Sequence, residues 1–296
     1  MIQELAIVGV GLLGGSVAKA ARAGGLARRI VGVGRDAARL RPALDDGTLD
    51  ATTTDLDAEM RKADFIVLAV PVLAIEGLLT RVWSAAPEGS VITDVGSTKR
   101  NIVRAAERLA AAPARRADAP EGSGGGRPPS FVGSHPLAGS EQTGYRVARA
   151  DLFRGATVVV TPTERTALGA LKTVTEFWEA LGARVSLLDP ETHDRTVAAI
   201  SHLPHLIACA LVDGAQRAEP SALELAARGF RDTTRIAAGD PDMWTEIFLA
   251  NRDALSASVE AFREALAELQ RAVDAGAAEP LRAALARIKA TRETLR

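Results

Sequence analysis

The chain has 296 residues, enough for two domains, and its 47% hydrophobic and 25% charged residues are ordinary globular usage, unlike a disordered chain. Its 36 basic and 37 acidic side chains nearly cancel, which argues against a nucleic-acid-binding protein. The single cysteine excludes an internal disulfide framework and a cysteine-based metal cluster, and it favours a cytoplasmic location. No apolar run has the length of a membrane span, so we expect no membrane partner.

Short apolar runs alternate with alanine-rich segments of helical spacing through the first part of the chain. This alternation predicts right-handed β-α-β units around a parallel sheet, and therefore an α/β fold. The predicted strands cover residues 5–8, 30–33, 65–70, 91–95, 131–133, 157–160 and 184–187, and a helix is predicted over 167–181. Residues 110–130 contain four prolines and four glycines but no large apolar residue, which predicts a mobile insertion on the surface.

The strand pattern stops near Asp189, and the rest of the chain has the spacing of helices. We therefore predict two domains, a sheet domain over residues 1–188 and an all-α domain over residues 189–296. Residues 253–273 carry a heptad stripe of apolar side chains, formed by Leu255, Val259, Phe262, Leu266, Leu269 and Val273. The stripe indicates one face of a packed helix or part of a subunit interface, and the two interpretations are compatible.

A glycine-rich turn lies between the first predicted strand and the first predicted helix. Gly9, Gly11 and Gly14 match the G-x-G-x-x-G pattern, in which the glycines permit a tight turn, close approach of the backbone to a pyrophosphate, and close helix packing. The helix that begins near Leu12 and Leu13 offers free N–H groups and the positive end of its dipole to the phosphates. The sheet domain is therefore predicted to be a Rossmann-type dinucleotide-binding domain.

The choice between NAD and NADP depends on the end of the second strand. NAD-binding folds commonly place an acidic residue there for the ribose 2′-hydroxyl, but Gly34 occupies that position. Arg35 favours a 2′-phosphate and hence NADP. Asp36 lies at nearly the expected spacing from Gly14, so it can still serve NAD, or it can cap the next helix. The residues favour NADP slightly and leave NAD open.

Two polar, glycine-containing segments follow predicted strands and indicate a reaction site. His135 directly follows one strand, in a segment that gathers serine, histidine and glutamate among glycines. Ser97 follows another strand, in the segment 94–99. Because the carboxyl ends of strands line the ligand crevice of an open α/β sheet, we expect these two segments to share one crevice.

These segments resemble the prephenate and arogenate dehydrogenases of tyrosine biosynthesis, and the resemblance covers nearly the whole chain in order. It implies a Rossmann-type domain followed by an all-α helical dimerisation domain, a homodimer, and NAD or NADP as coenzyme. The implied reaction is oxidative decarboxylation of prephenate to 4-hydroxyphenylpyruvate, with arogenate, which gives tyrosine, as the alternative substrate. Besides the glycine-rich turn, the matching segments are Asp94-Val95-Gly96-Ser97-Thr98-Lys99, Gly133-Ser134-His135-Pro136-Leu137-Ala138-Gly139 with Glu141, Ser201-His202-Leu203-Pro204-His205 and Gly229-Phe230-Arg231-Asp232-Thr233-Thr234-Arg235.

The resemblance also implies roles for single residues. His135 takes the proton of the substrate's ring hydroxyl, and Ser97 hydrogen-bonds the same oxygen or orients His135. Arg235 anchors a substrate carboxylate, for which a surface ion pair with Asp232 is the alternative role. The other residues expected near the substrate are His202, His205, Glu141, Asp232 and Trp244, and those expected near the coenzyme are Gly9, Gly11, Leu12, Leu13, Gly14, Arg35, Asp36, Val70 and Pro71.

The remaining histidines are interpreted more simply. His193 is expected to be a solvated residue at the start of a helix. Pro204, between His202 and His205, indicates the first turn of a helix or a kink. No metal is predicted at these two histidines, because no further cysteine or acidic ligand clusters with them.

Two other functions fit parts of the sequence. The β-hydroxyacid dehydrogenases and imine reductases share a glycine-rich N-terminal turn and a helical second domain, but they generally lack the segment around His135. The hydroxyacid enzymes usually place a catalytic lysine in the second domain, whereas the lysines after Lys99 are Lys172 and Lys289, and neither lies in such a motif. A coenzyme-sensing regulatory protein without turnover is the alternative from another class.

Overall fold

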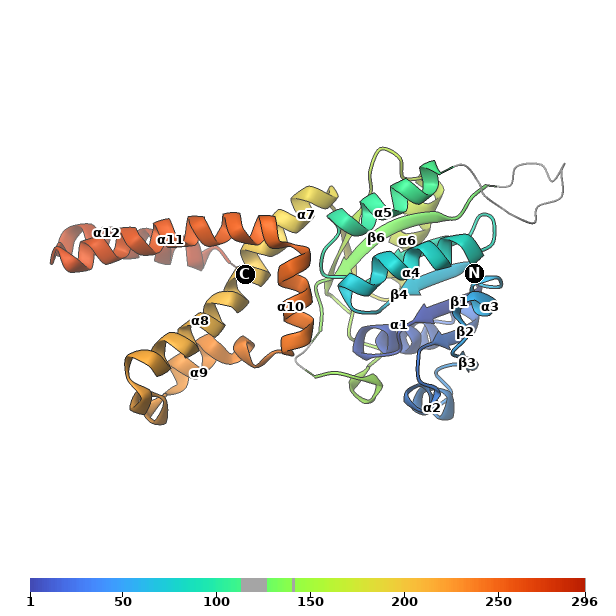
Figure 1. Cartoon of the computed structure of the whole chain (residues 1–296), viewed down its shortest axis with the longest axis horizontal. Coiled ribbons are helices and arrows are strands. Elements are labelled where there is room, and N and C mark those ends of the chain that lie inside the picture. Colours follow the sequence, from blue (N-terminus) through green and yellow to red (C-terminus); the bar gives the residue numbers. More distant parts are fainter. Residues whose placement is uncertain (113–126, 140–141, 296) are drawn as a thin grey trace.

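The computed structural model describes residues 1–112, 127–139 and 142–295. Most of the predicted insertion at 110–130 falls outside this part of the chain, and so does Glu141. The described residues form a sheet covered by helices, followed by a group of helices to one side of it (Figure 1).

The sheet domain is built on eight strands in one sheet. The strands are β1 (Ile2–Val8), β2 (Ala27–Val33), β3 (Ala51–Thr53), β4 (Phe65–Leu68), β5 (Val91–Asp94), β6 (Ser130–Pro136), β7 (Thr157–Thr161) and β8 (Arg184–Leu187). Their order is β3-β2-β1-β4-β5-β6-β7-β8. Neighbours from β3 to β6 are parallel, β7 is antiparallel to β6, and β8 is parallel to β7. The 3-2-1-4-5-6 order is that of dinucleotide-binding sheets, in which the crevice lies where the order reverses, next to β1 and β4.

The seven predicted strands are confirmed, and an eighth, β3, was missed because its three residues contain no apolar run. Its place is fixed by pairing with β2, where Val31 lies opposite Ala51. The prediction for β6 began one residue late and ended three residues early, since residues 133–136 pair with β7. His135 therefore lies within a strand and not directly after it.

Helices cover both faces of the sheet because the strands are apolar on both. Along β1, Leu5 and Ile7 pack into a core cluster with residues of α1 and α6, whereas Ala6 and Val8 pack into a second cluster with α4 and α5. The result is three layers of helix, sheet and helix. The helices are α1 (Leu12–Ala23), α2 (Ala37–Asp45), α3 (Leu56–Met60), α4 (Val72–Ala85), α5 (Arg100–Ala111) and α6 (Leu168–Ala180), with a short 3₁₀ turn at Tyr145–Val147.

The predicted change to helices after Asp189 is confirmed for the described residues. The main helices are α7 (Pro190–Val197), α8 (Leu203–Ala218), α9 (Arg228–Thr234), α10 (Pro241–Ala250), α11 (Arg252–Asp274) and α12 (Ala278–Glu293). A π-helical turn (Ala198–His202) joins α7 to α8, and 3₁₀ turns at Pro220–Leu225 and Arg235–Ala238 flank α9. In Figure 1, α10 lies beside the sheet domain, while α11 and α12 project away from it. Ile247 and Ala250 of α10 belong to the same core cluster as α4, which joins the two parts of the chain.

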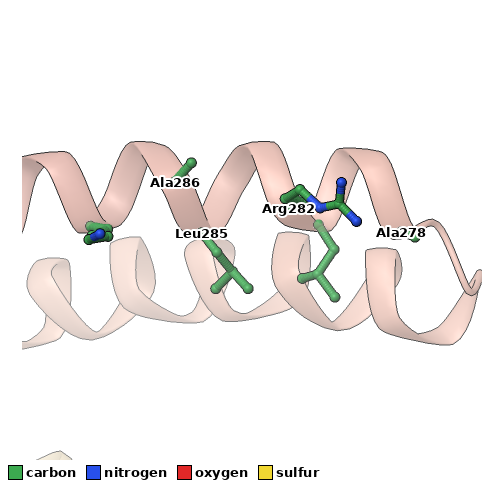
Figure 2. Close-up of a pocket in the computed structure, with 6 residues that line it drawn as sticks. Ala278, Arg282, Leu285 and Ala286 are labelled. Carbon is green, nitrogen blue, oxygen red and sulfur yellow. The ribbon is translucent and has the colours of Figure 1, made fainter.

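The heptad stripe of α11 is fully buried only at its beginning, and Val259, Phe262 and Leu269 are half-buried. Leu255 is 7% exposed, whereas Leu266 is 50% and Val273 is 60% exposed. The neighbouring α12 borders an open apolar hollow, and Figure 2 shows Leu285 pointing from α12 towards the adjacent helix while Ala286 points away. Leu255 therefore packs within the chain, whereas contact of the exposed Leu266 and Val273 with another subunit stays a prediction.

The helical stretch Pro190–Ala218 is, among the described residues, the one helix long and apolar enough to cross a membrane. Length and composition do not make it a membrane span, because it carries ionisable residues that hydrogen-bond to other elements of the chain. His193 contacts β6, Asp194 contacts α5, and His202 contacts Asn251. Within the single chain, 28% of its most apolar window is buried.

Two buried carboxylates face each other at the end of the sheet opposite the glycine-rich turn. Glu4 on β1 and Glu59 on α3 are 8% and 5% exposed. Desolvation, together with the charge and hydrogen bond of Glu59, raises the pKa of Glu4 above its ordinary value, although the nearby Arg29 and Lys62 partly oppose this. The folded protein therefore binds this proton more tightly than the unfolded chain does. As a result, the contribution of Glu4 to the free energy of unfolding becomes less favourable as the pH rises above 4.5, the ordinary pKa of a glutamate.

We predict that Glu4→Gln becomes more stable relative to the unmodified protein as the pH rises from acid to neutral, because the substitution removes one of two crowded carboxylates. The measurement is the difference in free energy of unfolding between the two proteins at several pH values. Glu224→Gln, at an exposed position, is the control for the loss of a carboxylate from the surface. A difference for Glu4→Gln that falls as the pH rises would contradict the assignment.

Candidate functional site

The glycine-rich turn has the geometry of a dinucleotide cradle. Gly9 has φ +94°, and a Cβ atom on it would lie 2.3 Å from the carbonyl oxygen of Ala69. A Cβ atom on Gly14 would lie 2.0 Å from the carbonyl oxygen of Gly9, so neither position accepts a side chain. A Cβ atom on Gly11 would have no described residue within 4 Å apart from its neighbours along the chain and the backbone of its own helix, so the space beside it is left open for a ligand. These residues fit the pyrophosphate of NAD or NADP.

The start of α1 is suited to an anion for a second reason. Gly11 caps this helix and provides no side-chain hydrogen bond, whereas Asp36 and Asp55 cap α2 and α3 with their carboxylates. The N–H groups of Leu12 and Leu13 lie at this end of the helix, where no carboxylate caps them, so they can bind an anion. The loop after β4 lies alongside, since Val70 Cγ1 is 2.9 Å from the Cβ position of Gly9, and Pro71 next to it caps α4.

Arg35 and Asp36, which follow β2, differ in the contacts that their side chains make. The Asp36 carboxylate accepts a hydrogen bond from the N–H of Ala38 at 2.9 Å and lies 3.6 Å from Arg39, so it acts as the cap of α2. Arg35 is exposed, and within the described ranges it makes no ion pair. Of the two roles that the sequence left open for Asp36, the structure contains the helix cap.

The carboxylate of Asp94 ties the end of β5 to β6. One oxygen accepts a hydrogen bond from the N–H of Ser134 at 3.1 Å, and the other accepts one from the N–H of Gly96 at 2.9 Å and from the Lys99 ammonium. Asp94 and Lys99 are both fully buried. Burial lowers the pKa of Lys99, while the charges of Asp94 and Asp194 oppose that shift. Through these bonds the segment that carries Ser97 is held against the strand that carries His135.

His135 faces the helical domain because side chains alternate along β6. Its neighbour Ser134 points the other way, where its hydroxyl accepts a hydrogen bond from Trp178 of α6 at 3.0 Å. His135 instead meets α7, with its Nδ1 atom 2.9 Å from Nε2 of His193. His193 Nδ1 in turn lies 2.8 Å from a carboxylate oxygen of Asp194.

His193 was predicted to be solvated, and that prediction is wrong. Its side chain has no exposed surface, because α7 lays it against β6 of the other domain. Sequence position near a helix start did not reveal this, since the partner lies 58 residues away in the chain. Asp194 was missed in the same way.

The local environment keeps these histidines neutral near pH 7. Desolvation is the main cause that holds the pKa of His135 well below its usual 6.5, and the charges of His193, Lys99 and His202 act in the same direction. Desolvation also lowers the pKa of His193, although the hydrogen bond to Asp194 opposes it. A neutral imidazole is able to accept a proton from a substrate.

Asp194 also holds the two domains together. Its carboxylate oxygens accept hydrogen bonds from the backbone N–H groups of Lys99 at 2.7 Å and Arg100 at 3.0 Å, which begin α5. The start of α5 has no capping side chain of its own, so this residue from the helical domain supplies the cap. Burial alone would raise the pKa of Asp194, but these N–H groups and His193 outweigh that effect and lower it.

A second group of aromatic residues lies deeper in the helical domain. His205 of α8 stacks on Trp244 of α10, with ring centroids 3.6 Å apart and an angle of 14° between the rings. Although His205 is only 3% exposed, its Nδ1 atom has no hydrogen-bond partner among the described residues, which leaves a buried polar atom available to a ligand. His202, buried beside the same tryptophan, lies with its Nδ1 3.1 Å from the side-chain nitrogen of Asn251, and desolvation lowers its pKa to about 4. Pro204 lies in the first turn of α8, directly after the π-helical turn within the continuous helical stretch Pro190–Ala218, so features of both predicted alternatives, a first turn and an irregular helix, are present.

The other predicted substrate residues are less closely connected. Arg235 is exposed in the 3₁₀ turn after α9, and Asp232 pairs with Arg228 at 3.2 Å instead of with Arg235. The alternative of an Arg235–Asp232 ion pair is therefore wrong. Ser97 is half-buried in the loop after β5, and Glu141 lies outside the described residues.

Taken together, the fold and site define a two-domain, nicotinamide-coenzyme-dependent oxidoreductase. A family model described as "Prephenate dehydrogenase, nucleotide-binding domain" matches residues 17–115 and 125–187, and one described as "Prephenate dehydrogenase, dimerization domain" matches residues 189–287. The chain belongs to the prephenate dehydrogenase family.

Similar proteins agree with this assignment. The prephenate dehydrogenase of Bacillus subtilis is 31% identical over 92% of this chain and 69% of its own length. The cyclohexadienyl dehydrogenase of Zymomonas mobilis is 32% identical over 92% of this chain and 89% of its own length. The prephenate dehydrogenase of Aquifex aeolicus, solved with hydroxyphenyl propionate and NAD⁺, matches with TM-score 0.88 and 32% identity over 100% of this chain and 99% of its own.

More distant structures share the fold alone. A 3-hydroxyisobutyrate dehydrogenase from Salmonella typhimurium matches with TM-score 0.59 but is 14% identical, covering 93% of this chain and 95% of its own. The likeness that suggested a β-hydroxyacid dehydrogenase as an alternative is therefore a likeness of architecture.

We predict that Lys99→Met lowers the free energy of unfolding by about 3–5 kcal/mol, the usual cost of leaving one charge of a buried pair without its partner. The measurement is urea denaturation of Lys99→Met, of Asp94→Asn and of the double variant Asp94→Asn/Lys99→Met. The double variant should lose less than the sum of the two single losses, because it removes both charges. Additive losses would show that the two side chains do not act as a pair.

Proposed function

We propose that this chain oxidises and decarboxylates prephenate to 4-hydroxyphenylpyruvate, with residues 1–188 binding the coenzyme and residues 189–296 binding substrate and a second subunit. The observation that carries the proposal is His135, a histidine of lowered pKa on β6, in the sheet that holds the glycine cradle. Arogenate is the second candidate substrate, because a Synechocystis arogenate dehydrogenase matches with TM-score 0.82 and 29% identity over 98% of this chain and 99% of its own.

The chain's own residues handle the proton of the reaction. When bound, NAD or NADP accepts the hydride from C4 of the substrate ring. His135 takes the proton of the hydroxyl on that carbon, so that the carbonyl forms as the hydride leaves. Ser97 hydrogen-bonds the same oxygen or orients His135. Loss of carbon dioxide follows from the gain of aromaticity and needs no further base.

The substrate has two carboxylates, and the helical domain offers groups to bind them. We propose Arg235 as the anchor of one carboxylate, because its guanidinium is exposed and forms no ion pair with any described residue. The unpartnered Nδ1 of His205, beside Trp244, is a second polar contact. His202, Asp232 and Glu141 complete the proposed surroundings of the substrate by resemblance to the family.

The residues after β2 support NADP over NAD. The carboxylate of Asp36 caps α2 through the N–H of Ala38 and lies 3.6 Å from Arg39, which partly balances its charge. The exposed guanidinium of Arg35 is free to meet a 2′-phosphate.

The exposed apolar residues of α11 and α12 support a homodimer through the helical domain, together with the dimerisation domain that the family model matches. Leu266, Val273, Leu285 and Ile288 are each at least 44% exposed in the single chain, which is costly for a monomer in water. The single cysteine supports a location in the cytoplasm.

The first experiment is a grid of four assays with purified protein, combining prephenate or arogenate with NAD or NADP and following the absorbance of the reduced coenzyme. We expect turnover of prephenate, faster with NADP than with NAD. Absence of turnover in all four, from folded protein that binds coenzyme, would reject the proposal.

Two variants separate the proposed roles. His135→Asn should lower kcat by about 10²- to 10⁴-fold while coenzyme affinity stays unchanged, because it removes the base but not the cradle. Arg235→Gln should instead raise the KM for substrate by about 10- to 100-fold, the usual effect of losing a charged hydrogen bond. Near-normal kcat in His135→Asn, or an unchanged KM in Arg235→Gln, would refute the role of that residue.

We predict that Arg35→Ser lowers the ratio of kcat/KM for NADP to that for NAD by about tenfold or more, because it removes the cation that faces the 2′-phosphate. Steady-state kinetics with both coenzymes measure this ratio. The matched control is Arg41→Ser, an arginine of α2 that pairs with Asp45. A ratio that falls equally in both variants would point to the general loss of positive charge instead.

A further inference from the structure

A continuous hydrogen-bonded chain runs from Asp194 through His193 to His135. The Asp194 carboxylate lies 2.8 Å from His193 Nδ1, and His193 Nε2 lies 2.9 Å from His135 Nδ1. His193 has no exposed surface, and Asp194 is 3% exposed. The first two residues come from α7 of the helical domain and the third from β6 of the sheet domain, so the chain of bonds crosses between the two.

The positions of the hydrogens follow from the chemistry of the three groups. An ionised carboxylate only accepts hydrogen bonds, so the proton of His193 lies on Nδ1, facing Asp194. A neutral imidazole carries one N–H, so His193 Nε2 is an acceptor. The contact at 2.9 Å then requires His135 to donate through Nδ1. One nitrogen of His135, Nε2, is left with its lone pair free.

We propose that His193 and Asp194 are positioning residues that fix His135 as the tautomer whose Nε2 atom is the base. The inference rests on the proposed function, because it concerns the proton that His135 receives from the substrate. It assigns a role to a residue of the helical domain in the chemistry of the sheet domain.

The proton balance of the step is complete. As the hydride leaves the ring carbon, the O–H bond of the substrate breaks and an Nε2–H bond forms on His135. The imidazolium keeps its Nδ1–H bond directed at His193, and the Asp194 carboxylate at the far end of the chain compensates the positive charge. The proton passes to water after the product leaves, which restores neutral His135.

Other charged groups face His135, but the proposal does not assign them this task. Lys99, at the start of α5, and His202, before α8, both disfavour a positive charge on His135. Neither of them forms a hydrogen bond with His135 among the described residues, whereas His193 does. His193 therefore is the group in a position to choose which nitrogen carries the proton.

His193 is the residue to substitute, because Asp194 also caps α5 and its loss would disturb the domain contact. His193→Leu removes the acceptor for His135 Nδ1. His193→Gln is the matched variant, since its side-chain oxygen reaches about as far as Nε2 and still accepts that hydrogen bond, although it loses the link to Asp194. Coenzyme affinity and thermal unfolding monitor the fold of both variants.

We expect kcat in His193→Leu to fall by about 10²- to 10⁴-fold with the substrate KM within a few-fold, and His193→Gln to recover part of the loss. In His193→Leu, kcat should also rise with pH as hydroxide replaces the base, whereas the unmodified protein should stay flat above pH 6.5. A structural defect alone would not give that pH profile. A His193→Leu variant with unchanged kcat and pH profile would overturn the proposal.

The tautomer is measurable without turnover. Nitrogen-15 spectra of the imidazole rings distinguish Nδ1–H from Nε2–H, and with four histidines in the chain the signal of His135 is identified by its loss in His135→Asn. We expect Nδ1–H on His135 in the unmodified protein and predominantly Nε2–H in His193→Leu. Nε2–H in the unmodified protein would overturn the inference even if the enzyme is active. Lack of turnover in the four assays, with Nδ1–H observed, would instead count against the proposed function alone.

Discussion

The Asp194 carboxylate is the contact on which the arrangement of the site depends. It caps α5 of the sheet domain from a helix of the other domain, and it holds the ring of His193 at the same time. Because the start of α5 has no capping side chain of its own, the two N–H groups at Lys99 and Arg100 would otherwise lose their partners. The same carboxylate therefore both joins the helical domain to the sheet domain and orients His193.

A second buried carboxylate does the corresponding work inside the sheet domain. Asp94 joins the end of β5 to β6 and compensates the charge of Lys99, so the loop with Ser97 and the strand with His135 are held as one unit. Both carboxylates are acceptable in the interior because they receive several hydrogen bonds each. His135, the proposed base, follows Ser134 on β6 and contacts His193, so each carboxylate binds one of its neighbours.

The coenzyme side of the crevice depends on backbone shape more than on charge. Gly9 and Gly14 are required by contacts of 2.3 and 2.0 Å that any side chain would make, while Gly11 leaves an open space for the ligand. The helix end beside it has no capping side chain. A phosphate therefore meets free N–H groups at a place where the chain provides no competing anion.

The sequence by itself determined the architecture, the glycine cradle and most of the candidate residues. Apolar periodicity and glycine spacing are local properties, and they were sufficient for seven strands and the change to helices after Asp189. The sequence did not predict strand β3 or the full length of β6, because three-residue strands and strand ends depend on pairing with a neighbouring strand. The Asp194–His193–His135 chain was decided by tertiary structure alone. His135 and His193 are 58 residues apart in the chain. The packing of α7 against β6 buries His193 and brings it into contact with His135, the proposed base.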